Sequence, residues 1–263
     1  MTGRTTTKNY RCYADGYDLS GFGRSIGPLE ITYDEVDMTA TMGDTVKGYM
    51  RNHPQVNAGT FNAVFDNTAT TGLHALSVTP NGTLRNIMIP IGMRTAPVDG
   101  DPVFCGQFTQ SGYQETEDGG AVTASMNFSG WGANATSLNY AMPWGQLLHA
   151  KAIRLSATGV NTDAGFLNDG GALITSTTRG GFFMYQVFAG NGTATLSVED
   201  SDDWDDPADY DATVATTALL NCALPQAGII ASSTMTIREG LRWQIAFTSA
   251  TTVTFACAFM RVY

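Results

Sequence analysis

One stretch of the sequence decides its fold class: Val122-Thr-Ala-Ser-Met-Asn-Phe128. Apolar side chains alternate with polar ones along it, and an alternation with a period of two is typical of a β-strand with one buried face. Residues 242–248 and 252–259 alternate in the same way, with Trp243 and Phe255 in the apolar set. These three segments predict β-structure.

Other segments have the composition of short strands, because they are rich in β-branched and aromatic residues. They are 29–39, 60–66, 84–91, 103–109, 182–189, 193–199 and 234–238. Clusters such as Pro80-Asn-Gly and Asn168-Asp-Gly-Gly separate them, and clusters of this kind mark turns. Residues 70–76 indicate a short helix with a threonine at its amino-terminal cap. The pattern predicts an all-β sandwich or barrel with one short helix.

The chain has 263 residues, which is enough for two domains. Loop-like sequence at Pro143-Trp-Gly separates two sets of predicted strands. We therefore expect a first domain at 1–145 and a second β-sandwich, of jelly-roll or immunoglobulin-like type, at 146–263. Residues 1–27 are rich in Gly and Thr, and we expect them to form an arm that orders only against a partner.

The charge balance excludes one class of function. The chain carries 14 Lys and Arg against 24 Asp and Glu, a net charge of −10, whereas proteins that read duplex DNA cluster basic residues against phosphates. No apolar run approaches the roughly 18 residues of a membrane-spanning helix, and no secretory leader opens the chain. We expect no membrane insertion and synthesis in the cytoplasm. The four scattered cysteines are interpreted as reduced and buried.

Eight of the eleven acidic residues of the second domain are crowded into the thirteen residues 199–211. Carboxylate oxygens are the ligands that Ca²⁺ prefers, which makes Asp200, Asp202 and Asp205 candidate metal ligands. The spacing lacks the glycine and the glutamate of the calcium-loop template, so a solvated loop between strands is the alternative interpretation. Whether this loop faces solvent or a lumen is left open by the sequence.

Candidate catalytic groups lack the context of a catalytic motif. None of the three histidines, His53, His74 and His149, stands beside a nucleophile motif, and no G-x-S-x-G or H-E-x-x-H occurs. Two carboxylate pairs have a spacing that glycoside hydrolysis could use: Glu30 with Glu35, and Glu115 with Glu117. Because the second pair precedes Gly119-Gly120, it is also typical of an exposed hairpin end. We expect no enzyme activity and no cofactor.

The first half of the chain resembles a known family. Tyr17-Asp-Leu-Ser-Gly-Phe22 is followed by a strand-like segment at 29–39, by Gly43-Asp44, and by a Gly-led strand at 59–66 that precedes the short helix. In this order the segments are similar to the core of the tail tube proteins of tailed bacteriophages. The resemblance covers about residues 15–130, and it implies a tail-tube-type β-sandwich or barrel. The second domain would then be an added surface sandwich.

The resemblance also implies a function. Tail tube subunits form hexameric rings that stack into a channel for DNA, and a negatively charged wall would let phosphates slide without binding. The partners implied are other copies of this chain, further tail proteins at the tube ends and DNA passing through the lumen, in the tail of a virion. Segment 40–58 would be a long loop at the interface between subunits. Its contact residues would be Asp44, Val46, Tyr49, Met50, Arg51 and His53.

Two other functions fit a chain of this composition. The first is a phage capsid decoration or head-fibre protein, in which the β-sandwich would bind a shell lattice. The second is a carbohydrate-binding or glycan-hydrolysing β-sandwich. Ring or tube formation, binding to expanded capsids and a response to soluble sugars would distinguish the three.

Overall fold

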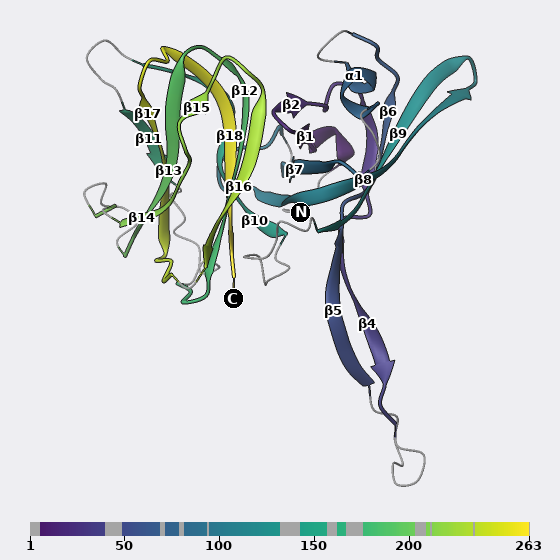
Figure 1. Cartoon of the computed structure of the whole chain (residues 1–263), viewed down its shortest axis with the longest axis horizontal. Coiled ribbons are helices and arrows are strands. Elements are labelled where there is room, and N and C mark those ends of the chain that lie inside the picture. The colour runs from purple at the N-terminus through teal and green to yellow at the C-terminus, as the bar shows by residue number, and fades with distance from the viewer. Residues whose placement is uncertain are drawn as a thin grey trace.

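The computed structural model shows an all-β protein, as the sequence predicts. It describes residues 6–39, 49–68, 72–78, 82–93, 95–131, 143–156, 162–166, 176–202, 209–210, 212–233 and 235–262. Figure 1 shows two β-rich lobes side by side and a narrow two-stranded arm that extends away from one of them. The described residues contain one α-helix, the five-residue α1 (Leu73–Ser77), close to the predicted position. It begins after Gly72, which makes no side-chain cap.

The amino-terminal lobe is a curled set of antiparallel strands around an aromatic core. Its elements are the 3-10 turn η1 (Thr7–Asn9), β1 (Tyr13–Ala14), β2 (Tyr17–Asp18), β3 (Gly23–Gly27), β6 (Gly59–Val64), β7 (Leu84–Pro90), β8 (Pro102–Asp118) and β9 (Ala121–Trp131). Phe61, Phe104 and Phe108 are buried in one cluster with Leu73 of α1. The helix therefore covers one side of this core, because burying Leu73 removes apolar surface from water.

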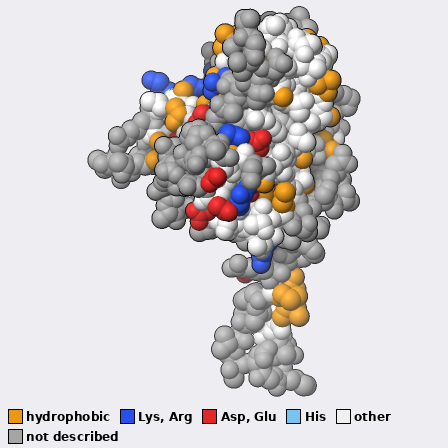
Figure 2. Space-filling view, turned by 90° about the vertical axis from the view of Figure 1, so that its left-hand side faces the viewer, with side chains coloured by type: hydrophobic (Ala, Val, Ile, Leu, Met, Phe, Trp, Pro, Cys, Tyr) orange, Lys and Arg blue, Asp and Glu red, His pale blue; other side chains and the backbone are white. Residues whose placement is uncertain are grey.

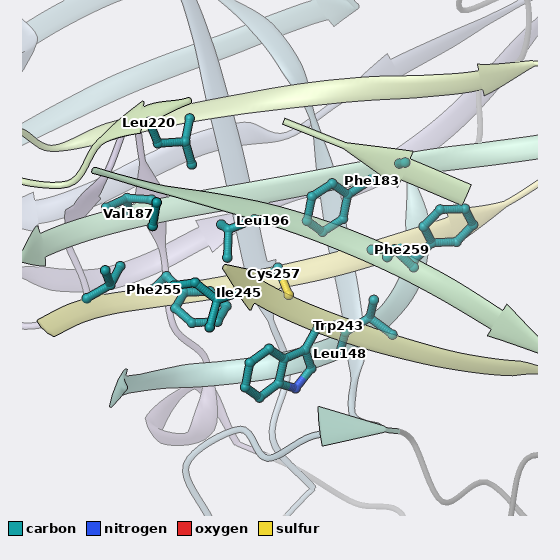
Figure 3. Packing of buried hydrophobic residues seen from close by; sticks show 14 of the residues in the cluster. Leu148, Phe183, Val187, Leu196, Leu220, Trp243, Ile245, Phe255, Cys257 and Phe259 are labelled. Atoms are coloured by element: carbon teal, nitrogen blue, oxygen red, sulfur yellow. The ribbon is translucent and has the colours of Figure 1, made fainter. Parts of the chain in front are cut away.

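The carboxy-terminal lobe is a sandwich of two sheets. One contains β10 (Trp144–Leu155), β12 (Gly180–Gly190), β16 (Gln226–Ser233) and β18 (Thr252–Arg261); the other contains β11 (Thr162–Phe166), β13 (Thr193–Ser201), β14 (Ala212–Thr216), β15 (Leu220–Asn221) and β17 (Gly240–Phe247). Figure 3 shows Phe183, Trp243 and Phe255 pointing into the space between these sheets. The alternating apolar residues of β13 and β17 supply much of this core.

A single sheet of eleven strands runs through both lobes, in the order β16-β12-β18-β10-β8-β7-β1-β2, with β9, β6 and β3 joined through β8. Strand β10 makes the connection, since its start pairs with β8 and most of its length pairs with β18. The boundary expected between residues 145 and 146 lies inside this strand. A third apolar cluster, containing Met88, Phe182 and Met260, fills the space between the lobes.

Residues 6–27 are part of the amino-terminal lobe, and this corrects the expectation that residues 1–27 order only against a partner. Cys12, Tyr13 and Leu19 are buried, and β1 pairs with β7. The correction has a physical cause: the tight turn at Asp15-Gly16, where both residues have positive φ, lets β1 and β2 form a hairpin that wedges between the lobes. Composition alone did not reveal this turn.

The arm consists of β4 (Glu30–Asp37) and β5 (Tyr49–Asn57), which form a two-stranded sheet of their own. The sequence predicted β4, but it assigned 40–58 to a loop. Residues 49–57 are instead a strand in antiparallel register with β4, from Glu30 opposite Asn57 to Asp37 opposite Tyr49. Asn52 and Pro54 are typical of loops, and pairing with β4 overrides that local preference.

In the carboxy-terminal lobe, the strand expected at 234–238 is also corrected. Residues 234–238 were expected to form a strand, but among those that the structure describes only Ile237 makes an isolated bridge, to Thr177. The strand is β16, just before that segment. Its sequence does not alternate, because Ile229 and Ile230 pack on opposite faces against two different apolar clusters. A strand that is covered on both faces lacks the period of two.

Candidate assembly surface

The outer part of the arm exposes apolar side chains. Tyr33, Val36, Met38 and Met50 are all exposed, and 57% of the surface of each methionine is accessible. Figure 2 shows a patch of hydrophobic side chains on the projecting arm, below the body of the molecule. Single exposed apolar residues are ordinary, whereas several on one slender projection form a candidate binding surface.

The base of the arm is anchored, unlike its outer part. Val56 is buried in the core of the amino-terminal lobe, and Leu29 and Ile31 pack against that core. Gly59 follows β5 at a φ of +65°, and a Cβ there would lie 2.3 Å from the backbone of Gly27. This close approach of two backbones fixes the direction in which the arm leaves the lobe.

The register of the arm determines which residues of β4 and β5 stand opposite each other. Val36 stands opposite Met50, and Glu35 stands opposite Arg51. Opposite residues of an antiparallel pair share a face, and neighbours along a strand alternate. One face of the outer arm therefore presents the exposed apolar pair Val36 and Met50.

The predicted interface residues are distributed over the arm and the segment beyond it. Met50 is exposed on β5. Tyr49, Arg51 and His53 are also positions of β5. Asp44 and Val46 lie outside the described residues. The sequence did not single out the exposed residues Tyr33, Val36 and Met38 of the neighbouring strand and its end. Met38, just before the predicted loop, was a usable signal, since methionine is frequent at binding surfaces.

The acidic segment 199–211 is anchored by arginines at both of its ends. The carboxylate of Asp200, which is 2% exposed, accepts hydrogen bonds from the backbone N–H of Arg238 at 2.7 Å and from its Nε at 3.1 Å. The carboxylate of Glu199 accepts one from Nε of Arg242 at 2.9 Å, and the same guanidinium donates to the carbonyl of Tyr210 at 2.9 Å. Arg242 thus ties the two ends of the segment together.

This arrangement bears on the candidate metal ligands. Both oxygens of Asp200 are engaged by Arg238, while the exposed carboxylate of Asp202 lies 3.8 Å from the same guanidinium. Asp205 lies outside the described residues. Within the described ranges, no group of three His, Cys, Asp or Glu side chains could hold a metal ion. Asp200 is arranged as the partner of an arginine.

Two candidate catalytic residues, His74 and Glu115, meet where α1 contacts β8, whereas Glu30, Glu35 and His53 are positions of the arm. Nδ1 of His74 lies 3.0 Å from the hydroxyl of Tyr113 and 2.9 Å from a carboxylate oxygen of Glu115. The Tyr113 hydroxyl donates to the same oxygen at 3.0 Å. Burial, together with this hydrogen bond, raises the pKa of Tyr113. The three groups hold the short helix on the sheet. Glu117 lies further along β8, beside the turn at Gly119-Gly120 that ends the hairpin.

His149 is buried in the core of the carboxy-terminal lobe, stacked on Phe255. Its Nδ1 lies 3.2 Å from the Phe255 carbonyl oxygen, and its Nε2 accepts a hydrogen bond from Nε of Arg154 at 2.8 Å. Burial, and then the charge of Arg154, lowers the pKa of His149 to about 3. The neutral imidazole holds Arg154 over the ring of Trp243. His149 therefore has a structural role in this lobe.

Comparisons with known proteins add little to this geometry. No protein-family model matches the chain, and no curated protein is similar to it. Among solved structures, the chain is similar to the Dit (gp 19.1) protein of SPP1, described as a paradigm of the hub adsorption apparatus in phages that infect Gram-positive bacteria. The similarity has a TM-score of 0.33 and 10% identity, over 94% of this chain and 98% of that one. Likeness at this level carries no functional argument. Within the described part of the chain, no helix is long and apolar enough to cross a membrane.

Proposed function

We propose that this chain is a structural subunit of a bacteriophage tail tube. Copies of it associate into rings, and the rings stack into a channel through which DNA passes. The proposal rests on one observation above all, the apolar arm formed by β4 and β5. The resemblance of residues 15–130 to tail tube proteins supplies the class of assembly.

The physical argument begins with the stability of the arm. An isolated two-stranded hairpin is marginal in water, and the outer part of this one exposes Val36 opposite Met50. Burying such side chains against another molecule contributes about 1.5–3 kcal/mol each. An arm that is rigid at its base and apolar at its outer part is suited to lie on a neighbouring copy.

Repetition of one such contact builds a ring. The arm and the surface that receives it are different parts of the chain, so the contact is heterologous, and it closes when the rotation between copies divides a full turn. The net charge of −10 suits a lumen that carries DNA, because an acidic wall does not retain phosphates. In this function the chain needs neither a catalytic group nor a cofactor.

Shortening the arm tests the proposal. Replacing residues 36–50 by Asn-Gly connects Glu35 to Arg51 through a two-residue turn of the type that favours hairpins. Glu35 and Arg51 already stand opposite each other in the arm. The matched control shortens the β8–β9 hairpin by replacing residues 117–122 with Asn-Gly between Thr116 and Thr123, which also stand opposite each other.

The full chain and the control are expected to form rings or tubes in negative-stain electron microscopy and to sediment as oligomers. The arm-shortened chain should keep the same melting temperature within roughly 2 °C and remain a monomer. A full chain that stays monomeric at every concentration, or an arm-shortened chain that assembles normally, would contradict the proposal.

A further inference from the structure

A pocket opens into the amino-terminal lobe between the segment that precedes β1 and strand β3. It is lined by residues 10–12, Ser20, residues 23–26 and Phe61, and its volume is about 40 Å³. A water-sized atom fills about 10–15 Å³ of such a volume, so the pocket has room for one small functional group. Cys12 and Phe61 are buried, and polar contacts made beside such apolar groups are stronger than in water.

The charged side chains around the pocket are positive. Arg11 and Arg24 line it, and none of its described lining residues is acidic, although the chain has 24 acidic residues against 14 basic ones. Asp15 and Asp18, which follow in the sequence, pair with basic side chains outside the pocket. The pocket therefore attracts an anion in a chain whose overall charge repels anions.

Arg11 is held in place by the backbone. Its Nη1 donates to the carbonyl of Lys8 at 3.1 Å and to the carbonyl of Tyr10 at 2.8 Å, which uses both N–H groups of that nitrogen. Among the described residues, neither Nε nor Nη2 of Arg11 has a hydrogen-bond partner. Together these two nitrogens form the planar fork that binds both oxygens of a carboxylate. The guanidinium is thus oriented before a ligand arrives.

Two serine hydroxyls add further donors. Oγ of Ser20 accepts a hydrogen bond from the backbone N–H of Cys12 at 3.0 Å, and Oγ of Ser25 accepts one from Nδ2 of Asn62 at 3.0 Å. Neither hydroxyl hydrogen has an acceptor in the described part of the chain. Because each oxygen already accepts from the protein, each serine offers a ligand its O–H group as a donor. The pocket thus suits a group that only accepts hydrogen bonds.

The size of the pocket selects among anions. A carboxylate is planar, and its two oxygens match the fork of a guanidinium, whereas a tetrahedral phosphate has more atoms and needs more space than about 40 Å³ offers. We propose that this pocket binds a carboxylate group, held by Nε and Nη2 of Arg11 and by the hydroxyls of Ser20 and Ser25. The acid is either a dissolved small molecule or a side chain of another copy of the chain.

This inference does not depend on the proposed function. One copy of the chain supplies every described group that lines the pocket, so the monomer is able to bind the ligand. Loss of assembly in the arm-shortened chain would therefore leave the inference standing. Loss of carboxylate binding would likewise leave the tube function standing.

Titration with sodium acetate tests the pocket. At pH 7.5 acetate is fully ionised, and nitrogen–proton correlation spectra of the full chain are recorded at constant ionic strength. The backbone amides of Arg11, Cys12 and Ser25 should shift and saturate in the millimolar range, which is typical of so small a ligand. The amides of β17, in the other lobe, should not shift. Sodium chloride should not produce these shifts, and inorganic phosphate should bind more weakly than acetate.

Variants of Arg11 separate a shaped site from general attraction between charges. Arg11→Gln should weaken acetate binding at least about tenfold, because it removes a charge-assisted pair of hydrogen bonds. Arg179→Gln, at an exposed position of the other lobe, changes the net charge equally and should bind acetate as the unmodified chain does. Arg11→Lys keeps the charge but lacks the fork, so its affinity should also fall, by at least about threefold.

A serine pair keeps the test decisive if the Arg11 variants do not fold. Ser25 and Ser111 are both exposed strand positions, but only Ser25 lines the pocket. Ser25→Ala should weaken acetate binding by at least about threefold, whereas Ser111→Ala should leave it unchanged.

The source of the carboxylate is read from a dilution series without acetate. If another copy supplies it, the amides of Arg11 and Ser25 shift as the protein concentration rises, and acetate reverses the shift. If a dissolved acid supplies it, these amides do not depend on protein concentration. Absence of a saturable response to acetate, tighter binding of phosphate than of acetate, or full affinity in Arg11→Lys overturns the inference.

Discussion

The backbone N–H of Gly16 donates a hydrogen bond of 2.7 Å to Oε1 of Gln186, across the junction of the two lobes. The other end of the same amide, Nε2 of Gln186, donates to the carbonyl of Asn86 at 2.9 Å. Gln186 is completely buried, so one side chain from the carboxy-terminal lobe satisfies two backbone groups of the amino-terminal lobe. Beside it, Lys151 pairs with Asp18 at 2.7 Å. The lobes are joined by packing and by polar contacts.

Removing the Gln186 amide should weaken the whole molecule. In Gln186→Ala, the backbone N–H of Gly16 loses its partner, whereas the carbonyl of Asn86 keeps the hydrogen bond that it accepts from the N–H of Asp15. Leaving this buried donor unsatisfied costs about 1–3 kcal/mol. The melting temperature should fall by roughly 2–4 °C for each kcal/mol, and differential scanning calorimetry measures this. An unchanged melting temperature would show that the junction does not depend on this side chain.

Gly16 offers a second test of the junction. Its φ is +84°, and a Cβ there would lie 2.3 Å from the backbone nitrogen of Gln226. Gly16→Ala should therefore destabilise the chain by at least about 1–2 kcal/mol from the backbone conformation alone. Gly21→Ala is the matched control, because a Cβ at Gly21 meets nothing within 4 Å. Urea unfolding curves compare the two variants. Equal midpoints would contradict the close packing of the β1–β2 turn between the lobes.

His149 makes stability depend on pH. Its folded pKa of about 3 lies below the ordinary value of 6.5, so the unfolded chain binds one more proton between these values. The stabilisation is complete above pH 6.5 and is lost as pH falls from there towards 3. From pH 7.5 to pH 5 the loss should be about 2 kcal/mol.

The variant His149→Gln isolates this effect, because glutamine does not titrate. Urea unfolding at pH 7.5 and at pH 5 should show a smaller loss of stability in the variant than in the unmodified chain, by about 2 kcal/mol. Equal losses in the two proteins would mean that His149 is not the neutral buried group that its contacts with Arg154 and Phe255 require.

The acidic segment should respond to loss of its arginine partner more than to metal. Because Arg238 engages both oxygens of Asp200, removing chelatable metal with EDTA or adding Ca²⁺ should leave the melting temperature unchanged. Asp200→Asn should lower it by several degrees, since a buried charge-assisted hydrogen bond contributes about 1.5–3 kcal/mol. A large loss of stability in EDTA would restore the calcium interpretation.

The all-β class was predictable because residues 122–128 and 242–248 have one face in a core and one outside it. The arm was only half predictable: β4 alternates, whereas β5 contains Pro54 and becomes a strand through its partner. Strand β16 was missed for a different reason, since Ile229 and Ile230 are both covered. The alternation of apolar and polar residues predicts a strand with one exposed face, but it does not predict which distant segments pair.

The candidate assembly surface and the acidic segment were also predictable only in part. Met50 was chosen from its residue type, and it is exposed on the arm. Val36, which stands opposite it, was not chosen, because the sequence contains no sign that the two strands pair. Asp200 was chosen for its charge, but its partner Arg238 is 38 residues away. Such contacts follow from the register of the strands.

The apolar outer part of the arm should matter for assembly and not for folding. The double variant Val36→Ser with Met50→Ser removes an exposed opposite pair, so the melting temperature of the monomer should stay within about 1–2 °C. The concentration needed for assembly should rise at least about tenfold. The exposed residues Leu219 and Leu224 of the other lobe, changed to serine, are the control in sedimentation velocity experiments.

Photocrosslinking from the arm tests the central claim most directly. Met50 and Val98 are comparably exposed, but only Met50 lies on the arm, so each is replaced in turn by benzoylphenylalanine in the full chain. Under illumination at a concentration where oligomers form, the probe at Met50 should give a covalent dimer of two identical chains, and the probe at Val98 should give much less. If the probe at Met50 gives no dimer while oligomers are present, the arm is not the contact between copies, and this account of the protein is wrong.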